Sequence, residues 1–262
     1  MKLKIKKMIK SLLLSILCVF GVSQNSTSQE LLTHKDPDGT TYYSCTSHGQ
    51  FLQNEIDTSD YEVISSSCVS MWQTHANNFG MRSKDWKNGW GFNSCTESSP
   101  LKRTLKSLEL IKISKNSSLS NNKIINYMYD RAASYTSRLR PKCSKNATQG
   151  AVGSFFFGTI NIYAAGLDED LMYLTSIITH EARHAIKSHN AGFDAGECEW
   201  GGSCDTTFDY YGANAYELAY LWAYGVHSKN STTYTRDRAL QIASRTNLVA
   251  FEVSPNFNIP VP

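Results

Sequence analysis

The chain has 262 residues, of which 41% are hydrophobic and 19% are charged, and its formal net charge is +3. This length suits a single domain that buries a sizeable core. Residues 1–23 contain five lysines and no acid, so the remainder carries a net charge of about −2, and we expect no nucleic-acid partner.

The first 23 residues are typical of a signal peptide. A lysine-rich start precedes the apolar run Leu12–Val22, which is too short for a membrane-spanning helix. Gly21 and Ser23 are small residues that fit a cleavage site before Gln24. We therefore expect 24–262 to be one secreted or periplasmic domain without stable membrane association. An uncleaved anchor is the alternative.

Six cysteines remain after this segment is removed, since Cys18 lies within it. An even number of cysteines in an exported protein indicates three disulfides, although six cysteines allow fifteen pairings. Thiolate zinc ligands are the less favoured alternative, because the sequence has no Cys-x-x-Cys. Cys198 and Cys204 flank a short glycine-containing loop and are a natural local pair, and the other candidates are Cys45, Cys68, Cys95 and Cys143.

The amino-terminal lobe, 41–150, follows a polar and irregular stretch over 24–40. Its aromatic residues up to Cys95 are expected mainly in the core. Leu101–Ile113 fits a strand or a helix, and an apolar stripe from Ile124 to Leu139 predicts a helix that ends before Pro141.

The expected catalytic region, 151–250, begins with one strand over Gly153–Ala165, rich in aromatic and β-branched residues. A helix over 168–187 follows, because leucines and isoleucines recur there every three or four residues. Further helices are expected over 212–221 and 236–247, and an extended tail over 254–262.

The 168–187 helix contains His180-Glu181-x-x-His184. Residues four apart share one face of a helix, so the two imidazoles can bind one cation. Glu181 lies beside them, where its carboxylate can take a proton from an activated water. A helix with two solvated or hydrogen-bonded histidines is the alternative interpretation.

From Asp168 to Lys187 the chain resembles the zincins, the His-Glu-x-x-His zinc metallopeptidases. The resemblance implies an α+β fold with a small sheet, a strand before the metal-binding helix and a mostly helical carboxy-terminal lobe, here held by disulfides. It also implies that residues 156–163 form an edge strand that pairs with extended substrate, unless this strand is fully buried. Arg183 departs from the family pattern and is expected to point away from the metal, toward a carboxylate.

A catalytic zinc needs a third protein ligand. The metzincin pattern fails, because Lys187 and Asn190 occupy its glycine and third-histidine positions. By resemblance to the glutamate zincins, Glu217 in the later 212–221 helix is the favoured third ligand. His189 is the main alternative, and Asp194, Glu197, Asp205 and Asp209 stay open.

Residues around these ligands have expected supporting roles. Asp205 or Asp209 can orient a ligand imidazole. Four side chains are candidates for stabilising an oxyanion, and the sequence does not select among them: His189, Tyr210, Tyr211 and His227.

Together these observations predict a secreted hydrolase that uses Zn²⁺ and most closely resembles a peptidase acting on peptides or proteins. Two alternatives remain. One is a secreted binding or wall-associated module in which metal is structural or absent. The other is an amidase acting on cell-wall peptides. The sequence does not indicate an oligomeric state.

Overall fold

The computed structural model describes only part of the chain: residues 31–35, 41–45, 64, 66–87, 90–93, 95, 99–114, 123–142, 153–167, 169–191, 198–200, 203–228 and 231–255. The expected signal peptide, 1–23, lies outside these residues, as do Cys143, Asp194 and Glu197. The side chain of Cys45 is also outside the description. None of the described helices combines the length and the apolar character needed to cross a membrane.

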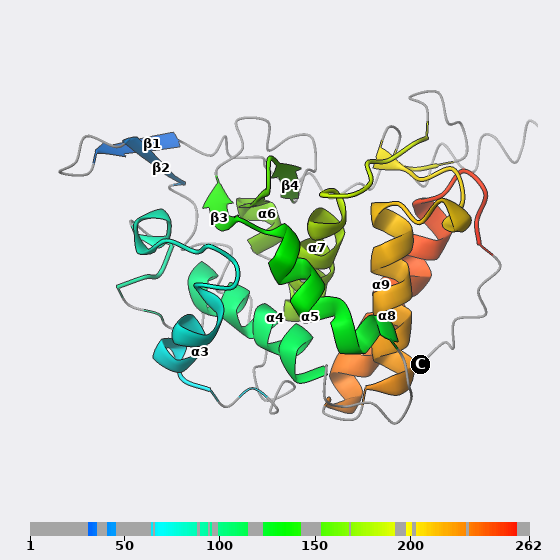
Figure 1. Cartoon of the computed structure of the whole chain (residues 1–262), viewed down its shortest axis with the longest axis horizontal. Coiled ribbons are helices and arrows are strands. Elements are labelled where there is room, and N and C mark those ends of the chain that lie inside the picture. Colours follow the sequence, from blue (N-terminus) through cyan, green and yellow to red (C-terminus); the bar gives the residue numbers. More distant parts are fainter. Residues whose placement is uncertain are drawn as a thin grey trace, which may run out of the picture.

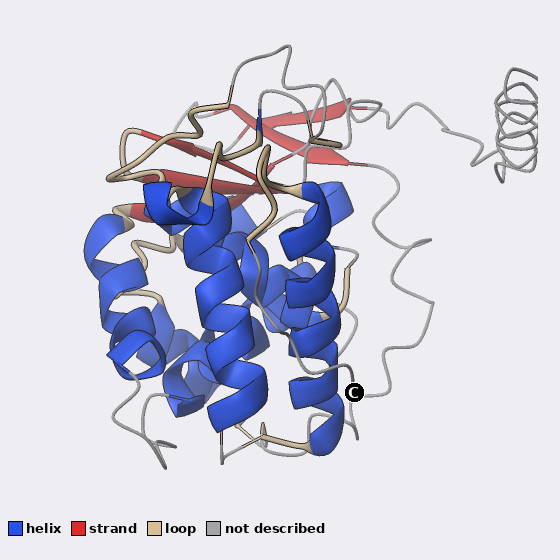
Figure 2. Cartoon of the chain, turned by 90° about the vertical axis from the view of Figure 1, so that its right-hand side faces the viewer, coloured by secondary structure: helices blue, strands red, loops and turns tan. Residues whose placement is uncertain are grey.

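The architecture is α+β, with a three-stranded sheet at one end of a group of helices (Figures 1 and 2). A separate hairpin, β1 (Leu31–Lys35) and β2 (Thr41–Cys45), falls partly in the stretch expected to be irregular. The helices are α3 (Cys68–His75), α4 (Pro100–Ser114), α5 (Lys123–Tyr135), α6 (Ala164–Leu167), α7 (Leu171–Arg183), α8 (Ala213–His227) and α9 (Thr233–Val249), with 3-10 turns η2 (Ser83–Trp86) and η5 (Phe208–Tyr210).

The three-stranded sheet contains β3 (Arg138–Lys142), β4 (Gly153–Phe156) and β5 (Thr159–Tyr163) in the order β3-β5-β4. Strand β5 pairs in parallel with β3 and antiparallel with β4, which is therefore an edge strand of the described sheet. The single strand expected over 153–165 is thus a hairpin. Its turn uses Phe157 at φ 44° and Gly158 at φ 76°, the two left-handed residues that suit a tight hairpin turn.

The structure differs from the sequence prediction for one further element and decides between two predicted alternatives for another. The helix expected up to Leu139 ends at Tyr135, and Pro141 lies in β3 instead. Proline is tolerated there because β3 is the other edge of this sheet. The ambiguous stretch Leu101–Ile113 is helical, and most residues of α4 are buried.

Helix α7 lies at the centre of the molecule and packs against α4, α5, α8 and α9 (Figure 1). Its leucines and isoleucines join a core that also holds Phe79, Trp86 and Trp90, as expected for the aromatic-rich stretch. Burial of each large apolar side chain contributes about 1.5–3 kcal/mol. A polar contact also fixes the position of α7 relative to α4, because Ser107 Oγ donates to the carbonyl oxygen of Leu171 at 3.1 Å. A rigid, centrally packed α7 is therefore the platform for any site on its surface.

Two disulfides join described cysteines. Cys198 pairs with Cys204, as expected, and Cys68 pairs with Cys95. The first closes a short loop just before η5, and the second ties the start of α3 to the segment preceding α4.

Candidate metal centre

The carboxy-terminal part of α7 carries the His-Glu-x-x-His sequence. Asp170 caps the helix, since its Oδ1 accepts a hydrogen bond from the Tyr173 amide at 2.9 Å. His180 lies in the last turn and His184 is the residue at which the helix ends. Their ring centroids are 5.1 Å apart, so both imidazoles face the same region, as the four-residue spacing predicts.

A third imidazole joins these two from outside the helix. His189 lies in the extended segment after α7, with its ring centroid 5.1 Å from that of His180 and 4.7 Å from that of His184. One nitrogen from each of the three rings lies within 4.8 Å of the others. The three histidines can therefore hold a metal ion, and among the described residues this is the group of histidine, cysteine and carboxylate side chains that meets this spacing.

Each of these rings has an oxygen atom next to its Nδ1. His180 Nδ1 lies 2.9 Å from Glu217 Oε2, His184 Nδ1 lies 3.2 Å from the carbonyl oxygen of Lys187, and His189 Nδ1 lies 3.1 Å from Asp205 Oδ1. Carboxylate and carbonyl oxygens only accept hydrogen bonds, so each Nδ1 carries the proton. A neutral imidazole with its proton on Nδ1 has its lone pair on Nε2, and this is the state that binds a metal.

The three Nδ1 partners have different origins. Glu217 is on α8 and is almost fully buried, with 5% of its surface exposed. Asp205 is in the loop before η5 and is 0% exposed. The Lys187 carbonyl belongs to the turn after α7 and is local to His184. Two long-range contacts and one local contact therefore orient the three rings.

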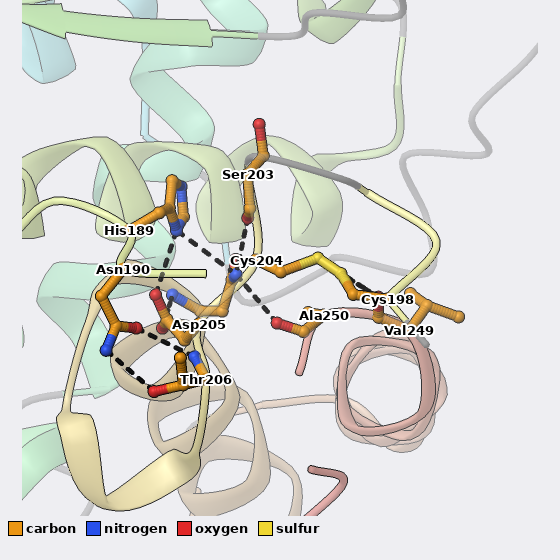
Figure 3. Close-up of a disulfide and its surroundings, with 10 residues drawn as sticks. His189, Asn190, Cys198, Ser203, Cys204, Asp205, Thr206, Val249 and Ala250 are labelled. Carbon is orange, nitrogen blue, oxygen red and sulfur yellow. Dashed lines mark hydrogen bonds and ion pairs between the residues drawn. A yellow bond between two sulfur atoms is a disulfide. The ribbon is translucent and has the colours of Figure 1, made fainter. Parts of the chain in front are cut away.

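Asp205 contacts His189 (Figure 3) and also ties several segments together. Its Oδ2 accepts from the amides of Asn214 and Ala215 at the start of α8, at 3.1 and 3.2 Å. Its backbone bridges the segment after α9, because the Asp205 amide donates to Ala250 at 3.0 Å and its carbonyl accepts from Glu252 at 3.1 Å. A buried carboxylate needs such partners to offset desolvation, and here they also set the position of His189.

The residues next to His189 and Asp205 are also held by hydrogen bonds. Asn190 exchanges two hydrogen bonds with Thr206, at 2.8 and 2.9 Å, next to the Asp205 contact (Figure 3). Cys204, one residue before Asp205, is fully buried and bonded to Cys198. The disulfide loop and the His189 segment thus form one continuous layer beside the histidines.

The histidines open into a cavity of about 640 Å³. Helix α7 supplies one wall, and β4, α8, α9 and the disulfide loop supply the others. The lining residues are Gly153, Ser154, Tyr173, Ser176, Ile177, His180, Glu181, His184, His189, Glu199, Trp200, Ser203, Glu217 and Arg245. A ligand of several residues in length fits such a volume.

Glu181 lies in this cavity beside the imidazoles. It is 6% exposed, and its Oε2 has no hydrogen-bond partner among the described residues. Burial raises the pKa of Glu181 to about 7, a shift that the charge of His180 opposes and the charge of Glu217 supports. Strand β4 passes close by, because a Cβ on Gly153 would lie 2.8 Å from Glu181 Oε1. The glycine therefore lets the strand approach the carboxylate.

The histidines differ in their electrostatic environments. Burial alone would lower the pKa of His180, but the hydrogen bond and the charge of Glu217 raise it above its ordinary value. Burial lowers the pKa of His184 to about 4, and the charges of His180 and His189 act in the same direction. A neutral His184 at neutral pH has its lone pair available for a cation.

The expected third ligand, Glu217, does not belong to the group of three. Its carboxylate lies on the Nδ1 side of His180, and the position expected of a third ligand is taken by His189. Sequence analysis placed His189 second because it follows no known spacing. Its position depends on Asp205, which is 16 residues further along the chain.

The other expected residues have separate places. Tyr210, Tyr211 and His227 do not line the cavity; His227 packs on Trp222 at 5.5 Å. Asp209 is exposed on η5. Asp205 and Asp209 were both expected to orient a ligand imidazole. Of these two, Asp205 contacts one of the clustered rings, that of His189.

Arg183 points away from the cluster, as expected, but its partners are not carboxylates. It donates to the carbonyl oxygen of Tyr211 at 2.8 Å and lies 4.9 Å from the ring centre of Tyr216. Lys187 donates to the carbonyl of Tyr210. These contacts hold the turn that leads into α8, and so explain a cation within the motif.

Sequence analysis missed several cavity residues, chiefly Tyr173, Trp200 and Arg245. Tyr173 had a usable signal, since it precedes His180 by seven residues and so shares its helical face. Trp200 and Arg245 had none, because their approach to the cavity depends on tertiary packing. Comparison with protein-family models, curated proteins and solved structures gives no match.

Proposed function

We propose that this protein is an exported zinc-dependent hydrolase that cleaves peptide bonds. The observation that supports this most directly is the combination, in one cavity, of three imidazoles close enough to share a metal ion and a carboxylate oxygen, Glu181 Oε2, without a hydrogen-bond partner among the described residues. A structural metal site is normally closed by a fourth protein ligand, whereas a catalytic one keeps a position open.

The proposed ligands are His180, His184 and His189, with Glu217 and Asp205 as orienting partners. Three neutral imidazoles match the preference of zinc for nitrogen ligands in a tetrahedral site. Zinc bound there would supply a Lewis acid that makes a water nucleophilic near neutral pH and polarises a carbonyl group. Carboxylates on the far ring nitrogen increase the basicity of the ligands.

Glu181 is the proposed proton carrier. A general base has to lie within reach of the proton that it accepts, and Glu181 lines the cavity together with His180 and His184. In the proposed reaction its carboxylate accepts the proton of the attacking water and then delivers it to the leaving amine. The lack of a competing hydrogen bond at Oε2 leaves this oxygen available.

Strand β4 is the proposed support for the substrate backbone. It is an edge of the described sheet, and its residues Gly153 and Ser154 line the cavity. An edge strand offers unpaired amide and carbonyl groups that can pair with an extended peptide. This role favours a peptide, from a protein or a cell wall, over a compact small-molecule substrate.

The test begins with metal analysis of the purified full-length protein, followed by assays on casein, mixed fluorogenic peptides and cross-linked cell-wall peptides with and without chelator. Glu181→Gln should retain the metal and lose turnover, whereas His184→Ala should lose both. Glu199→Gln is the matched control, because it makes the same change on an exposed cavity residue. Metal retained without hydrolysis in the unmodified protein would support a binding module instead.

A further inference from the structure

The cavity extends well beyond the histidine cluster. Tyr173 lies on the same face of α7 as His180, two turns earlier. At a rise of 1.5 Å per residue, seven residues correspond to about 10 Å along the helix. An extended peptide covers this distance with about three residues. The Tyr173 end of the cavity is therefore placed to meet a part of the substrate a few residues from the reacting bond.

A cation reaches this region from another helix. Arg245 lies on α9, which packs against α7 and α8 (Figure 1). Its side chain lines the same cavity. Within the described part of the chain, Arg245 makes no hydrogen bond and no ion pair at 4 Å or less. By contrast, the nearby Arg238 is paired with Asp170 at 2.7 Å. Arg245 thus has its guanidinium donors available to a ligand.

Tyr173 offers a second donor. Its side-chain hydroxyl has no hydrogen-bond partner among the described residues. Burial raises the pKa of Tyr173 to about 12, with the Glu217 charge acting in the same direction and the Arg245 charge opposing it. The phenol therefore stays protonated at neutral pH and can donate a hydrogen bond.

A guanidinium beside a hydroxyl donor is well suited to a carboxylate, because the planar fork forms two parallel charge-assisted bonds. Nearby acids do not fill this role in the structure. Glu217 is hydrogen-bonded to His180. The charge of Arg245 lowers the pKa of Glu169, but the two side chains form no ion pair within 4 Å in the described part of the chain.

We infer that Arg245 and Tyr173 form a subsite that binds a carboxylate of the substrate, about three residues from the bond that is cleaved. The inference rests on the proposed peptidase function and adds a substrate class to it. The carboxylate is either the free carboxy terminus of a peptide or an aspartate or glutamate side chain.

Binding to metal-loaded Glu181→Gln protein tests the subsite without turnover. The probes are fluorescein-labelled alanine hexapeptides that end in a carboxylate or in a carboxamide, and carboxamide peptides that carry one aspartate or one asparagine. We expect the carboxylate member of at least one pair to bind about tenfold more tightly. Preference within the first pair identifies a chain end, and preference within the second identifies an acidic side chain.

Arg245→Gln in the same background should remove this preference, and Tyr173→Phe should reduce it. Arg236→Gln is the control, because Arg236 is also on α9 but donates to Ser231 and does not line the cavity. Equal binding of both members of both pairs, or a preference that survives Arg245→Gln, overturns the inference. Hydrolysis by the unmodified protein is a separate measurement. If hydrolysis is seen, it supports the proposed function even when the subsite is refuted. If hydrolysis is absent, that result counts against the proposed function and not against the subsite.

Discussion

The carboxylate oxygen Oε2 of Glu217 lies 2.9 Å from Nδ1 of His180, and both side chains line the same cavity. This contact joins α8 to α7 on the Nδ1 side of the ring. In the proposed metal site, Glu217 therefore orients and polarises His180 and is not itself a ligand. The two roles have different consequences when the residue is changed.

Glu217→Gln should weaken metal binding without abolishing it. An amide oxygen still accepts from Nδ1, but it lacks the negative charge, and changes of this kind cost about 10- to 100-fold in affinity. His189→Ala should lose the metal as completely as His184→Ala does. Competition with a chromophoric chelator measures all three. The reverse ranking, in which Glu217→Gln loses the metal and His189→Ala keeps it, would return Glu217 to the ligand set.

Loss of the Cys68–Cys95 disulfide should reduce stability more, and loss of the Cys198–Cys204 disulfide should reduce metal affinity more. The bonded cysteines are 27 residues apart in Cys68–Cys95 and 6 apart in Cys198–Cys204. Chain-entropy estimates give about 3.5 kcal/mol for the longer loop and about 2.2 kcal/mol for the shorter. Replacing Cys68 and Cys95 by serine should thus cost more free energy of unfolding.

Metal affinity should follow the other order, because only Cys204 adjoins Asp205. The Cys198→Ser, Cys204→Ser protein should bind metal more weakly, while the Cys68→Ser, Cys95→Ser protein binds as the unmodified one does. Urea unfolding and metal titration on the same samples provide the two measurements. Equal metal affinities in the two folded variants would show that the short loop does not position His189.

Gly153→Ala should reduce turnover and leave metal content unchanged. The added Cβ would lie 2.8 Å from Glu181 Oε1 and 2.9 Å from Ile177 Cγ2, so the carboxylate or β4 must move. A displacement approaching 1 Å in a catalytic group costs roughly 100-fold in rate. Steady-state kinetics and metal analysis test this, with Thr159→Ala on the adjacent strand as the control. Unchanged turnover would mean that Glu181 tolerates the shift.

A buried ion pair far from the cavity should govern acid stability. His75 Nε2 lies 2.8 Å from Glu109 Oε2, and its Nδ1 lies 2.7 Å from the hydroxyl of Tyr129. The hydrogen bond from His75 holds the pKa of Glu109 below its ordinary value, with burial opposing the shift. A lowered folded-state pKa means that the ionised Glu109 stabilises the fold above its unfolded pKa of about 4.5.

Glu109→Gln should therefore cost about 1–3 kcal/mol of unfolding free energy at pH 7. The difference from the unmodified protein should shrink as pH falls through the lowered pKa of Glu109. Urea denaturation between pH 3 and pH 7 measures it, with the exposed Asp209→Asn as a control for simple charge loss. A difference that is constant with pH would rule out linkage through this carboxylate.

The sequence predicted the parts of the site that depend on local geometry. His180 and His184 share a helical face because of their spacing alone, and the short span between Cys198 and Cys204 favoured their pairing. His189 was harder to place, since it lies in an irregular segment whose position is set by Asp205 and by the end of α9. Long-range contacts of this kind produce no periodic pattern in the sequence.

Sheet elements were predicted less well, also for physical reasons. Residues 153–163 are rich in aromatic and β-branched residues and were expected to form one strand, but Gly158 permits a left-handed turn that divides them into two strands. Pro141 marks a helix end in sequence terms, yet it lies within a strand because that strand is an edge of the described sheet. The sequence around His75 gives no sign of its burial at 0% exposure, which depends on partners 34 and 54 residues away.

The bridge between Asp205 and the segment Ala250–Glu252 bears on how the protein matures. During synthesis, the ribosome produces His180 and His184 some seventy residues before it adds Glu252. Until that last segment is available, Asp205 lacks the backbone partners that hold it under His189. In the proposed metal site, a growing polypeptide therefore has only two imidazoles in place at first, and high-affinity binding of an ion requires the segment through Glu252 to be translated.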